Sequence, residues 1–393
     1  MPITLTPANT LPADGLAGTL IGRAWVPGPL PGPSPVAIRP EGVFDLSERF
    51  ATLTDLLELS APADAVRETQ GQFVATLEDV LANSGSACDR SKPYLLAPLD
   101  LHVIKAAGVT FATSMIERVI EEQAGGDAAK AQAVRAVVQD AIGGSLRSIV
   151  PGSEQASRLK ALLIEQGMWS QYLEVGIGPY AEIFTKAPVL SAVGSGCEIG
   201  IHPESQWNNP EPEVVLAVNS RGQIQGATLG NDVNLRDFEG RSALLLGKAK
   251  DNNASCAIGP FLRLFDDTFS LDDVRHCVVN LEVRGENGYV MCGSSSMDQI
   301  SRDPADLARQ TLNANHQYPD GFVLFLGTLF APTEDRDHPG GGFTHKLGDQ
   351  VSISSALLGG LHNQVTHSGD APPWTFGVSA LLRNLAARGL LAT

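Results

Sequence analysis

The sequence predicts an α+β protein built around a mainly antiparallel, rolled or barrel-like sheet, with a helical insert and a small N-terminal α+β domain. Three observations indicate this fold class. The N-terminal part of the chain is rich in proline and glycine, and its middle contains a segment with helical periodicity. From Ile183 onward, short runs rich in Val, Ile and Leu alternate with turn residues. A chain of 393 residues is too long for one compact core, which suggests two domains or one domain with a large elaboration.

We expect residues 1–90 to form the small N-terminal domain and residues 91–393 the larger one. The segment VPGPLPGPSPVAI favours extended structure and turns, and the segment FDLSERFATLTDLLEL that follows it favours short helices. Between about residues 116 and 166, apolar residues recur at three- and four-residue spacing, which predicts a helical insert with glycine hinges that acts as a lid. The short runs after Ile183, interrupted by one helix near residues 303–315, fit an antiparallel sheet better than repeated βαβ units.

Charge and cysteine content limit the partners and the compartment of the protein. The formal net charge is −16, with no basic stripe for phosphates, so nucleic acid and anionic membrane surfaces are not expected partners. Five scattered cysteines without a CxxC pair favour reduced thiols over a disulfide frame or a zinc site. The start shows no signal-peptide pattern, and no uncharged apolar stretch reaches the roughly 18 residues that span a bilayer. We therefore expect a cytoplasmic protein.

Two glutamates stand one proline apart in NNPEPEVVLAVN, at the start of an apolar strand-like run. Residues two apart in a strand point the same way, so the carboxylates of Glu211 and Glu213 converge on one face. Asp232 follows a strand-ending Gly-Asn turn 19 residues later, where an adjacent strand would bring a third carboxylate to the pair. Oxygen-only ligands suit a hard cation such as Mg²⁺, Mn²⁺ or Ca²⁺. The alternative is a solvated strand start without any metal.

Two lysines follow in GKAKDNNASCAIGPF, beside a polar loop. Lys248 or Lys250 near a cation site of three carboxylates would bind an anionic substrate and neutralise negative charge as an enolate forms. The alternative for either lysine is an ordinary surface charge.

The order of these segments resembles the fumarylacetoacetate hydrolase superfamily. The matching motifs run from Ile183 to Val351: IFTKAP from Ile183 to Pro188, E-x-E, NDxxxRD at 231–237, a lysine ten residues before the Pro of IGP, GTxxAP from 327, and GDxV from 348. The resemblance implies that Glu211, Glu213 and Asp232 bind the divalent cation and that Lys250 contacts the substrate. It also implies that Gly327 and Thr328 line the substrate pocket, and that the C-terminal part is a β-roll that assembles as a homodimer or homotetramer.

One departure from the family points to a particular branch. Hydrolases of the superfamily carry a His–Glu dyad that activates water, and here Glu117 matches while the His position is Ser114. Several segments look similar instead to the branch of 2-keto-3-deoxy-pentonate (xylonate or arabinonate) dehydratases, which yield 2,5-dioxopentanoate. In that branch a glutamate before the F-x-K-A element lies near the substrate, and Glu182 matches it. We expect Ser114 and Arg236 to contact the substrate as well.

The chemistry implied is removal of water from a small 2-keto acid, as in pentose catabolism. The cation polarises the C2 carbonyl, Lys250 stabilises the enolate, and the C4 hydroxyl leaves. Glu182 and Glu117 are the candidates for general base and general acid, with their roles unassigned. Two alternatives stay open: an acylpyruvate or fumarylacetoacetate-type C–C hydrolase, and a non-catalytic 2-keto-acid binding protein. Oxaloacetate decarboxylation is a conceivable side activity.

Overall fold

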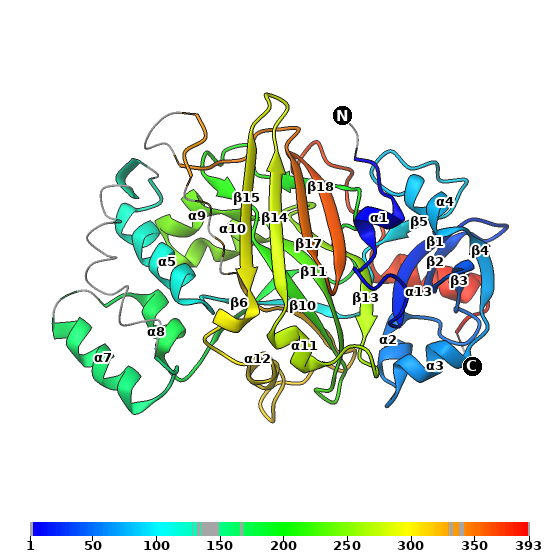
Figure 1. Ribbon diagram of the computed structural model, residues 1–393, viewed down its shortest axis with the longest axis horizontal. Coiled ribbons are helices and arrows are strands. Elements are labelled where there is room, and N and C mark those ends of the chain that lie inside the picture. Colours follow the sequence, from blue (N-terminus) through cyan, green and yellow to red (C-terminus); the bar gives the residue numbers. More distant parts are fainter. Residues whose placement is uncertain are drawn as a thin grey trace.

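The computed structural model describes residues 3–127, 129–131, 135, 149–165, 167, 169–328, 330, 332, 334–337 and 342–391. Figure 1 shows two sheets at the centre, with the N-terminal elements at one end and a group of helices at the other. No helix among the described residues is long and apolar enough to cross a membrane.

The larger sheet takes its strands from between Leu20 and Phe325 and contains eleven strands of the described part. Its strands are β1 (Leu20–Val26), β2 (Gly32–Arg39), β3 (Gly42–Asp45), β4 (Gln72–Ala75), β5 (Tyr94–Leu96), β6 (Val103–Gly108), β7 (Glu182–Ala187), β10 (Pro212–Val218), β11 (Ile224–Asp232), β13 (Cys256–Leu264) and β16 (Phe322–Phe325). The order is β4-β3-β2-β1-β13-β11-β10-β16-β6-β7, with β5 paired to β1. All its pairs are antiparallel except β16 with β6.

The second sheet packs on the first and has five described strands in the order β15-β14-β17-β18-β8. Its strands are β8 (Glu198–Ile201), β14 (Val278–Arg284), β15 (Val290–Ser296), β17 (Gln350–Ser355) and β18 (Gly359–His367). A short third pair joins β9 (Asn208–Asn209) to β12 (Asn234–Leu235). The expected antiparallel sheet is therefore present, but the larger sheet ends at β4 and β7, and the described strands form no closed barrel. β18 and β8 are a second parallel pair.

The helices gather at the two ends of the sheets (Figure 1). Near the N-terminal strands lie α1 (Pro7–Thr10), α2 (Leu53–Leu57), α3 (Pro62–Glu68), α4 (Leu77–Ala82) and α13 (Val378–Ala387); at the other end lie α5 (Ala112–Ala124), α7 (Glu154–Glu165), α8 (Gln171–Ile177), α9 (Arg236–Arg241) and α10 (Leu246–Lys250); α11 (Leu271–Arg275) and α12 (Pro304–Thr311) lie below the sheets. The helix expected near 303–315 is α12. Helices also occupy the ends of the expected insert, whereas residues 128, 132–134, 136–148 and 166 of it lie outside the described part. Its role as a lid stays a prediction.

β10 is buried on both faces, and this fixes where its first residues lie. Val214 and Leu216 belong to the main core between the two sheets, which includes Leu281 of β14. Val215 and Ala217 point to the opposite face and pack in a second core with residues of α2 and α3. Side chains at the N-terminal end of β10 are consequently held inside the molecule, where a carboxylate is costly unless it is paired.

The N-terminal segment shares the larger sheet with the rest of the chain. Leu20 and Ile21 of β1 pair with Arg263 and Leu262 of β13, so β1 to β4 extend that sheet. The segment also has a small core of its own around Val36, which includes residues of α4 and β5. The proposed domain division at residue 90 stays an expectation.

Candidate active site

Three buried carboxylates meet at the start of β10 and the end of β11. The two strands form a hairpin in which the backbone N–H of Asp232 donates to the carbonyl of Glu211 at 3.1 Å. Glu213 is two residues further along β10 and points to the same side. One oxygen from each of the three carboxylates lies within 4.8 Å of the others, and each residue is at most 5% exposed. The arrangement expected from the sequence is thus present.

Two lysines neutralise part of this charge. The ammonium group of Lys250, at the end of α10, lies 2.5 Å from Glu211 Oε2 and 3.0 Å from Asp232 Oδ2. The ammonium group of Lys186 is fully buried, 3.0 Å from Asp232 Oδ1, and donates to the backbone carbonyl of Lys250. Lys186 therefore connects β7, the hairpin and α10 beneath the carboxylates.

Alternate side chains of β7 point toward the group of carboxylates. Glu182, Phe184 and Lys186 share one face of this strand, because every second residue of a strand points the same way. Glu182 and Phe184 line the cavity beside the carboxylates, and the ammonium group of Lys250 lies 5.8 Å from the centre of the Phe184 ring. The sequence indicated Glu182 by resemblance, but gave no role to Lys186 inside the same F-x-K motif.

The opposite wall comes from the segment after β16. The backbone N–H of Gly327 donates to Glu213 Oε2 at 2.6 Å. Gly327 has a φ of +88°, and a Cβ there would lie 2.1 Å from Thr110 Oγ1, so no other residue fits without displacement. Gly327 and Thr328 both line the cavity, and their contact with substrate stays a prediction.

α5 contributes an arginine that the sequence analysis missed. Arg118 pairs with Glu211, with Glu121 at 2.7 Å and with Glu239 of α9 at 2.8 Å. Ser114, Arg118 and Glu121 lie three and four residues apart and so share one face of the helix. That spacing within GVTFATSMIERVIEE was the available signal for Arg118, whereas nothing local distinguished Glu239.

Glu117 and Arg236 lie next to the main cavity, not in its wall. Arg236 is 2% exposed, lies 3.2 Å from Glu117 Oε2, and stacks its guanidinium 4.4 Å from the centre of the Trp207 ring. Glu117 also pairs with Arg135. Both line a smaller neighbouring cavity that shares Ser114 with the main one, and their contact with substrate stays a prediction.

The main cavity is small and rich in carboxyl groups. Its volume is about 30 Å³, and the described side chains that line it include five carboxyl and two basic groups. The carboxyl groups are those of Glu182, Glu211, Glu213, Asp232 and Glu239, and the basic groups those of Arg118 and Lys250. If Lys186, which lies behind the wall, is counted as a third basic group, the carboxyl groups still outnumber the basic groups by two.

Burial and neighbouring charges change the proton affinity of these groups. Burial, followed by the charge of Glu239, raises the pKa of Glu182 to about 7. Burial, together with the charges of Asp232 and Glu211, holds the pKa of Glu213 well above its usual range. Burial would also raise the pKa of Asp232, but the ammonium groups of Lys186 and Lys250 lower it. Carboxyl groups that share a buried site thus have widely different proton affinities.

A divalent cation fits this donor set. Three buried carboxylates on neighbouring strands offer only oxygen ligands, which suit hard cations of the Mg²⁺, Mn²⁺ and Ca²⁺ type. When all five carboxyl groups are ionised, they carry two more charges than Arg118, Lys250 and Lys186 together, and one such ion would balance this excess. Glu211, Glu213 and Asp232 are the residues that could hold it.

The chain matches a known family over much of the site. Residues 179–366 match the family described as Fumarylacetoacetate (FAA) hydrolase C-terminal. This range contains Glu182, the hairpin carboxylates, Lys250 and Gly327, but not α5. The motifs quoted from the sequence therefore indicated the correct family.

Two curated relatives have dehydratase names. The chain is 26% identical over 331 residues to the probable 2-keto-3-deoxyxylonate dehydratase of Haloferax volcanii, covering 84% of this chain and 94% of the relative. It is 32% identical over 158 residues to the 2-dehydro-3-deoxy-D-arabinonate dehydratase of Saccharolobus solfataricus, covering 39% of this chain and 51% of the relative.

A solved structure shares the fold. The structure of a 2-keto-3-deoxy-D-arabinonate dehydratase complexed with magnesium and 2,5-dioxopentanoate superposes with a TM-score of 0.62 at 21% identity. The match covers 88% of this chain and 99% of that structure.

Proposed function

Residues 179–366 form a fumarylacetoacetate hydrolase domain, and on this basis we propose that the protein is a divalent-metal-dependent dehydratase, a carbon–oxygen lyase. Its substrate is a 2-keto-3-deoxy-pentonate and its product is 2,5-dioxopentanoate. The names of the two curated relatives and the magnesium and product in the related structure support this reaction. The observation that carries the proposal is the buried group of Glu211, Glu213 and Asp232 beside Lys250.

Mg²⁺ is the proposed metal, with Glu211, Glu213 and Asp232 as its ligands. A divalent cation held there supplies Lewis acidity toward the C2 carbonyl of a 2-keto acid. The carboxylates of Asp232 and Glu211 raise the pKa of Lys250 against the effect of burial, so Lys250 stays an ammonium group at neutral pH. This fixed positive charge stabilises the negative charge that develops on the keto-acid oxygen when the C3 proton is removed.

We assign the proton transfers to Glu182. A carboxyl group with a pKa of about 7 is a stronger base than an ordinary glutamate and is still largely ionised just above neutral pH. Glu182 takes the proton from C3, and the same proton then goes to the C4 hydroxyl, which leaves as water. Elimination leaves a keto acid with a C3–C4 double bond. Loss of a proton from C5 and protonation at C3 convert it to the C4–C5 enol, which becomes the C5 aldehyde by protonation at C4 and loss of the hydroxyl proton, so the conversion needs no redox cofactor. Glu117 is held in ion pairs with two arginines outside the cavity wall, which makes it the weaker candidate.

The structure gives little support to C–C bond hydrolysis. In this chain Ser114 occupies the position of the histidine in the water-activating dyad of the hydrolases. Its hydroxyl donates to the carbonyl of Phe111 at 2.8 Å and accepts from the N–H of Phe111 at 3.3 Å. A hydroxyl used to cap α5 is no replacement for an imidazole base.

The test is a product analysis with the purified chain, Mg²⁺ and either 2-keto-3-deoxy-xylonate or 2-keto-3-deoxy-arabinonate. We expect an aldehyde product of the mass of 2,5-dioxopentanoate, lost on chelation and in Glu213→Gln but kept in the exposed control Glu154→Gln. Formation of pyruvate and a second fragment would identify a C–C bond-cleaving enzyme instead. Tight binding of pyruvate or oxalate with no conversion of any keto acid would identify a non-catalytic binding protein.

The proposal also covers the oligomeric state of the protein, its cellular location and the metal ion that it uses. We expect a homodimer or homotetramer, which sedimentation of the purified chain tests, and a cytoplasmic location. Mn²⁺ and Ca²⁺ offer the same oxygen-ligand chemistry, so activity with each of the three ions ranks them.

A further inference from the structure

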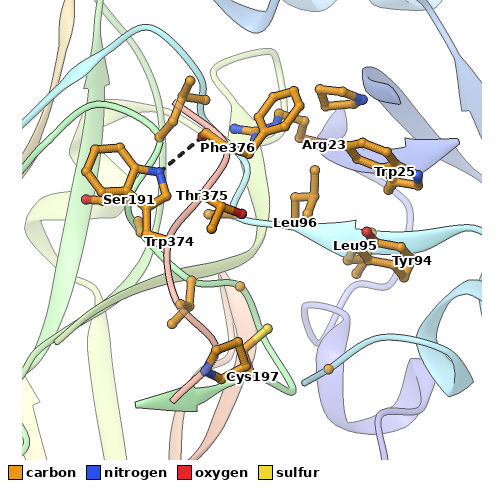
Figure 2. Close-up of a pocket in the computed structure, with 18 of the residues that line it drawn as sticks. Arg23, Trp25, Tyr94, Leu95, Leu96, Ser191, Cys197, Trp374, Thr375 and Phe376 are labelled. Carbon is orange, nitrogen blue, oxygen red and sulfur yellow. Dashed lines mark hydrogen bonds between the residues drawn. The ribbon is translucent and has the colours of Figure 1, made fainter. Parts of the chain in front are cut away.

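A second cavity of about 450 Å³ lies away from the acidic group. Its walls come from β1, β5, residues 190–194 after β7, and residues 372–376 after β18 (Figure 2). None of the residues assigned above to metal, substrate or proton transfer lines this cavity.

The walls of the second cavity are rich in aromatic rings. Trp25 and Tyr94 lie nearly parallel, with ring centres 6.3 Å apart and an interplanar angle of 12°. Phe376 meets Trp25 edge to face at 5.7 Å. Trp374, whose indole N–H donates to the carbonyl of Phe376 at 3.1 Å, is 45% exposed (Figure 2). Such walls suit a flat apolar body, which aromatic rings contact over a large area.

The charged groups of the cavity wall are all basic. Arg23 and Arg90 line it, and no carboxyl group of the described residues does. Arg23 is 8% exposed, donates to the carbonyl of Leu99, and leaves its buried Nε without a partner. Neither arginine forms an ion pair with any residue in the described part of the chain. The carboxylate of Asp100 is near enough to interact with the buried guanidinium of Arg23 without forming an ion pair, but burial outweighs this interaction and lowers the pKa of Arg23. A bound anion would therefore stabilise the guanidinium further.

One wall segment of the second cavity continues directly from the proposed active site. β7, which carries Glu182 and Lys186, leads into residues 190–194. Val193 is fixed there by backbone hydrogen bonds to Cys256 at 2.9 Å and Ile258 at 3.0 Å. A molecule in the second cavity would therefore touch a segment that is continuous with the acidic site.

We propose that the second cavity binds a small organic anion with a flat apolar body, of the aromatic monocarboxylate class. The carboxylate pairs with the guanidinium of Arg23, Arg90 adds positive charge, and the rings of Trp25, Tyr94 and Phe376 contact the flat body. This inference does not depend on the dehydratase reaction proposed above.

The test uses calorimetric titration of the full chain with 1-naphthoate and with 1-naphthalenemethanol, a neutral molecule of similar shape. We expect 1-naphthoate to bind with a Kd below about 1 mM and the neutral molecule to bind at least about tenfold more weakly, the usual effect of one charge-assisted hydrogen bond. Arg23→Gln should weaken 1-naphthoate binding about tenfold or more. Arg90 and Trp374 are exposed residues of the cavity wall. Arg90→Gln and Trp374→Ala should therefore also weaken 1-naphthoate binding, and they test the site if Arg23→Gln does not fold.

Two controls separate this site from other anion sites. Arg309→Gln removes a cation that is 73% exposed and lines none of the cavities described, so it should leave binding unchanged. Glu213→Gln changes the acidic site and should also leave binding unchanged; loss of binding there would mean that 1-naphthoate occupies the active site and would overturn the proposal. Equal binding of the neutral molecule, or no binding of 1-naphthoate, would overturn it too. If Trp374→Ala instead weakens self-association, the cavity belongs to an interface between two copies.

Discussion

Glu213→Gln should affect the free energy of unfolding in opposite ways with and without metal. In the metal-free protein the carboxylate of Glu213 is buried beside Asp232 and Glu211, which holds its pKa well above the usual range. Gln has nearly the same shape and its carbonyl oxygen can still accept the hydrogen bond from the Gly327 N–H. Replacing the acid by the neutral amide therefore removes an unfavourable charge and keeps the packing.

The size of the metal-free effect has an upper limit. At pH 7 the protein can protonate Glu213 instead of burying its charge, and neutralising a carboxyl whose ordinary pKa is 4.5 costs about 3 kcal/mol, at 1.36 kcal/mol per pH unit. We expect Glu213→Gln to stabilise the metal-free protein by up to about 3 kcal/mol. For a chain of this length, that corresponds to a rise in Tm of a few degrees.

Mg²⁺ should reverse this order. At about 1,000 times its Kd, a ligand that binds only the folded state stabilises the wild-type protein by about 4.1 kcal/mol, which exceeds the limit of about 3 kcal/mol above, and Glu213→Gln should lose most of this gain. The assay is thermal unfolding in EDTA and in a Mg²⁺ series, with Glu154→Gln, which is 80% exposed, as the matched control. A Glu213→Gln variant destabilised in EDTA would refute the electrostatic reasoning. A Mg²⁺ response equal to that of the wild type would remove Glu213 from the metal ligands.

Three further predictions concern single side chains. Because Glu182 is protonated below its pKa of about 7, kcat/KM should rise as pH increases through about 7, and Glu182→Gln should lose this rise; a fall through the same range would make Glu182 the acid. Lys186→Met leaves Asp232 without its fully buried partner and should cost about 3–5 kcal/mol in urea unfolding, whereas the half-exposed Lys160→Met should cost less than about 1 kcal/mol. Glu117→Gln should reduce kcat far less than Glu182→Gln does, because Glu117 lies outside the cavity wall; equal losses in steady-state assays would contradict that placement.

The carboxylate group was predictable because its geometry is local. Strand alternation alone places Glu211 and Glu213 on one side, and a hairpin that returns after one turn brings Asp232 opposite Glu211. Lys250 required a family motif, since its position follows from the path of α9 and α10 and not from any periodicity.

The features that the sequence did not predict depend on contacts between distant elements. Arg118 and Glu239 meet because α5 and α9 pack together, and no pattern within either helix shows that packing. The same holds for the shape of the sheet. Closure of a sheet depends on which strands lie at the two ends of its order. Among the described strands β7 pairs with β6 alone, so the sheet that they form is open. Strand identity can be read from alternation, but strand order is set by the tertiary fold.

Formation of the acidic group and folding of the whole sheet are therefore one process. Three carboxylates cannot be buried by a hairpin alone, because their mutual repulsion and desolvation would oppose it. Their partners come from separate elements: Lys186 from β7 and Arg118 from α5. A variant that weakens the packing of either element should lower the stability and the metal affinity of the protein together. Measuring both quantities on one variant therefore distinguishes a lost ligand, which lowers metal affinity without lowering the stability of the metal-free protein, from a lost support, which lowers both.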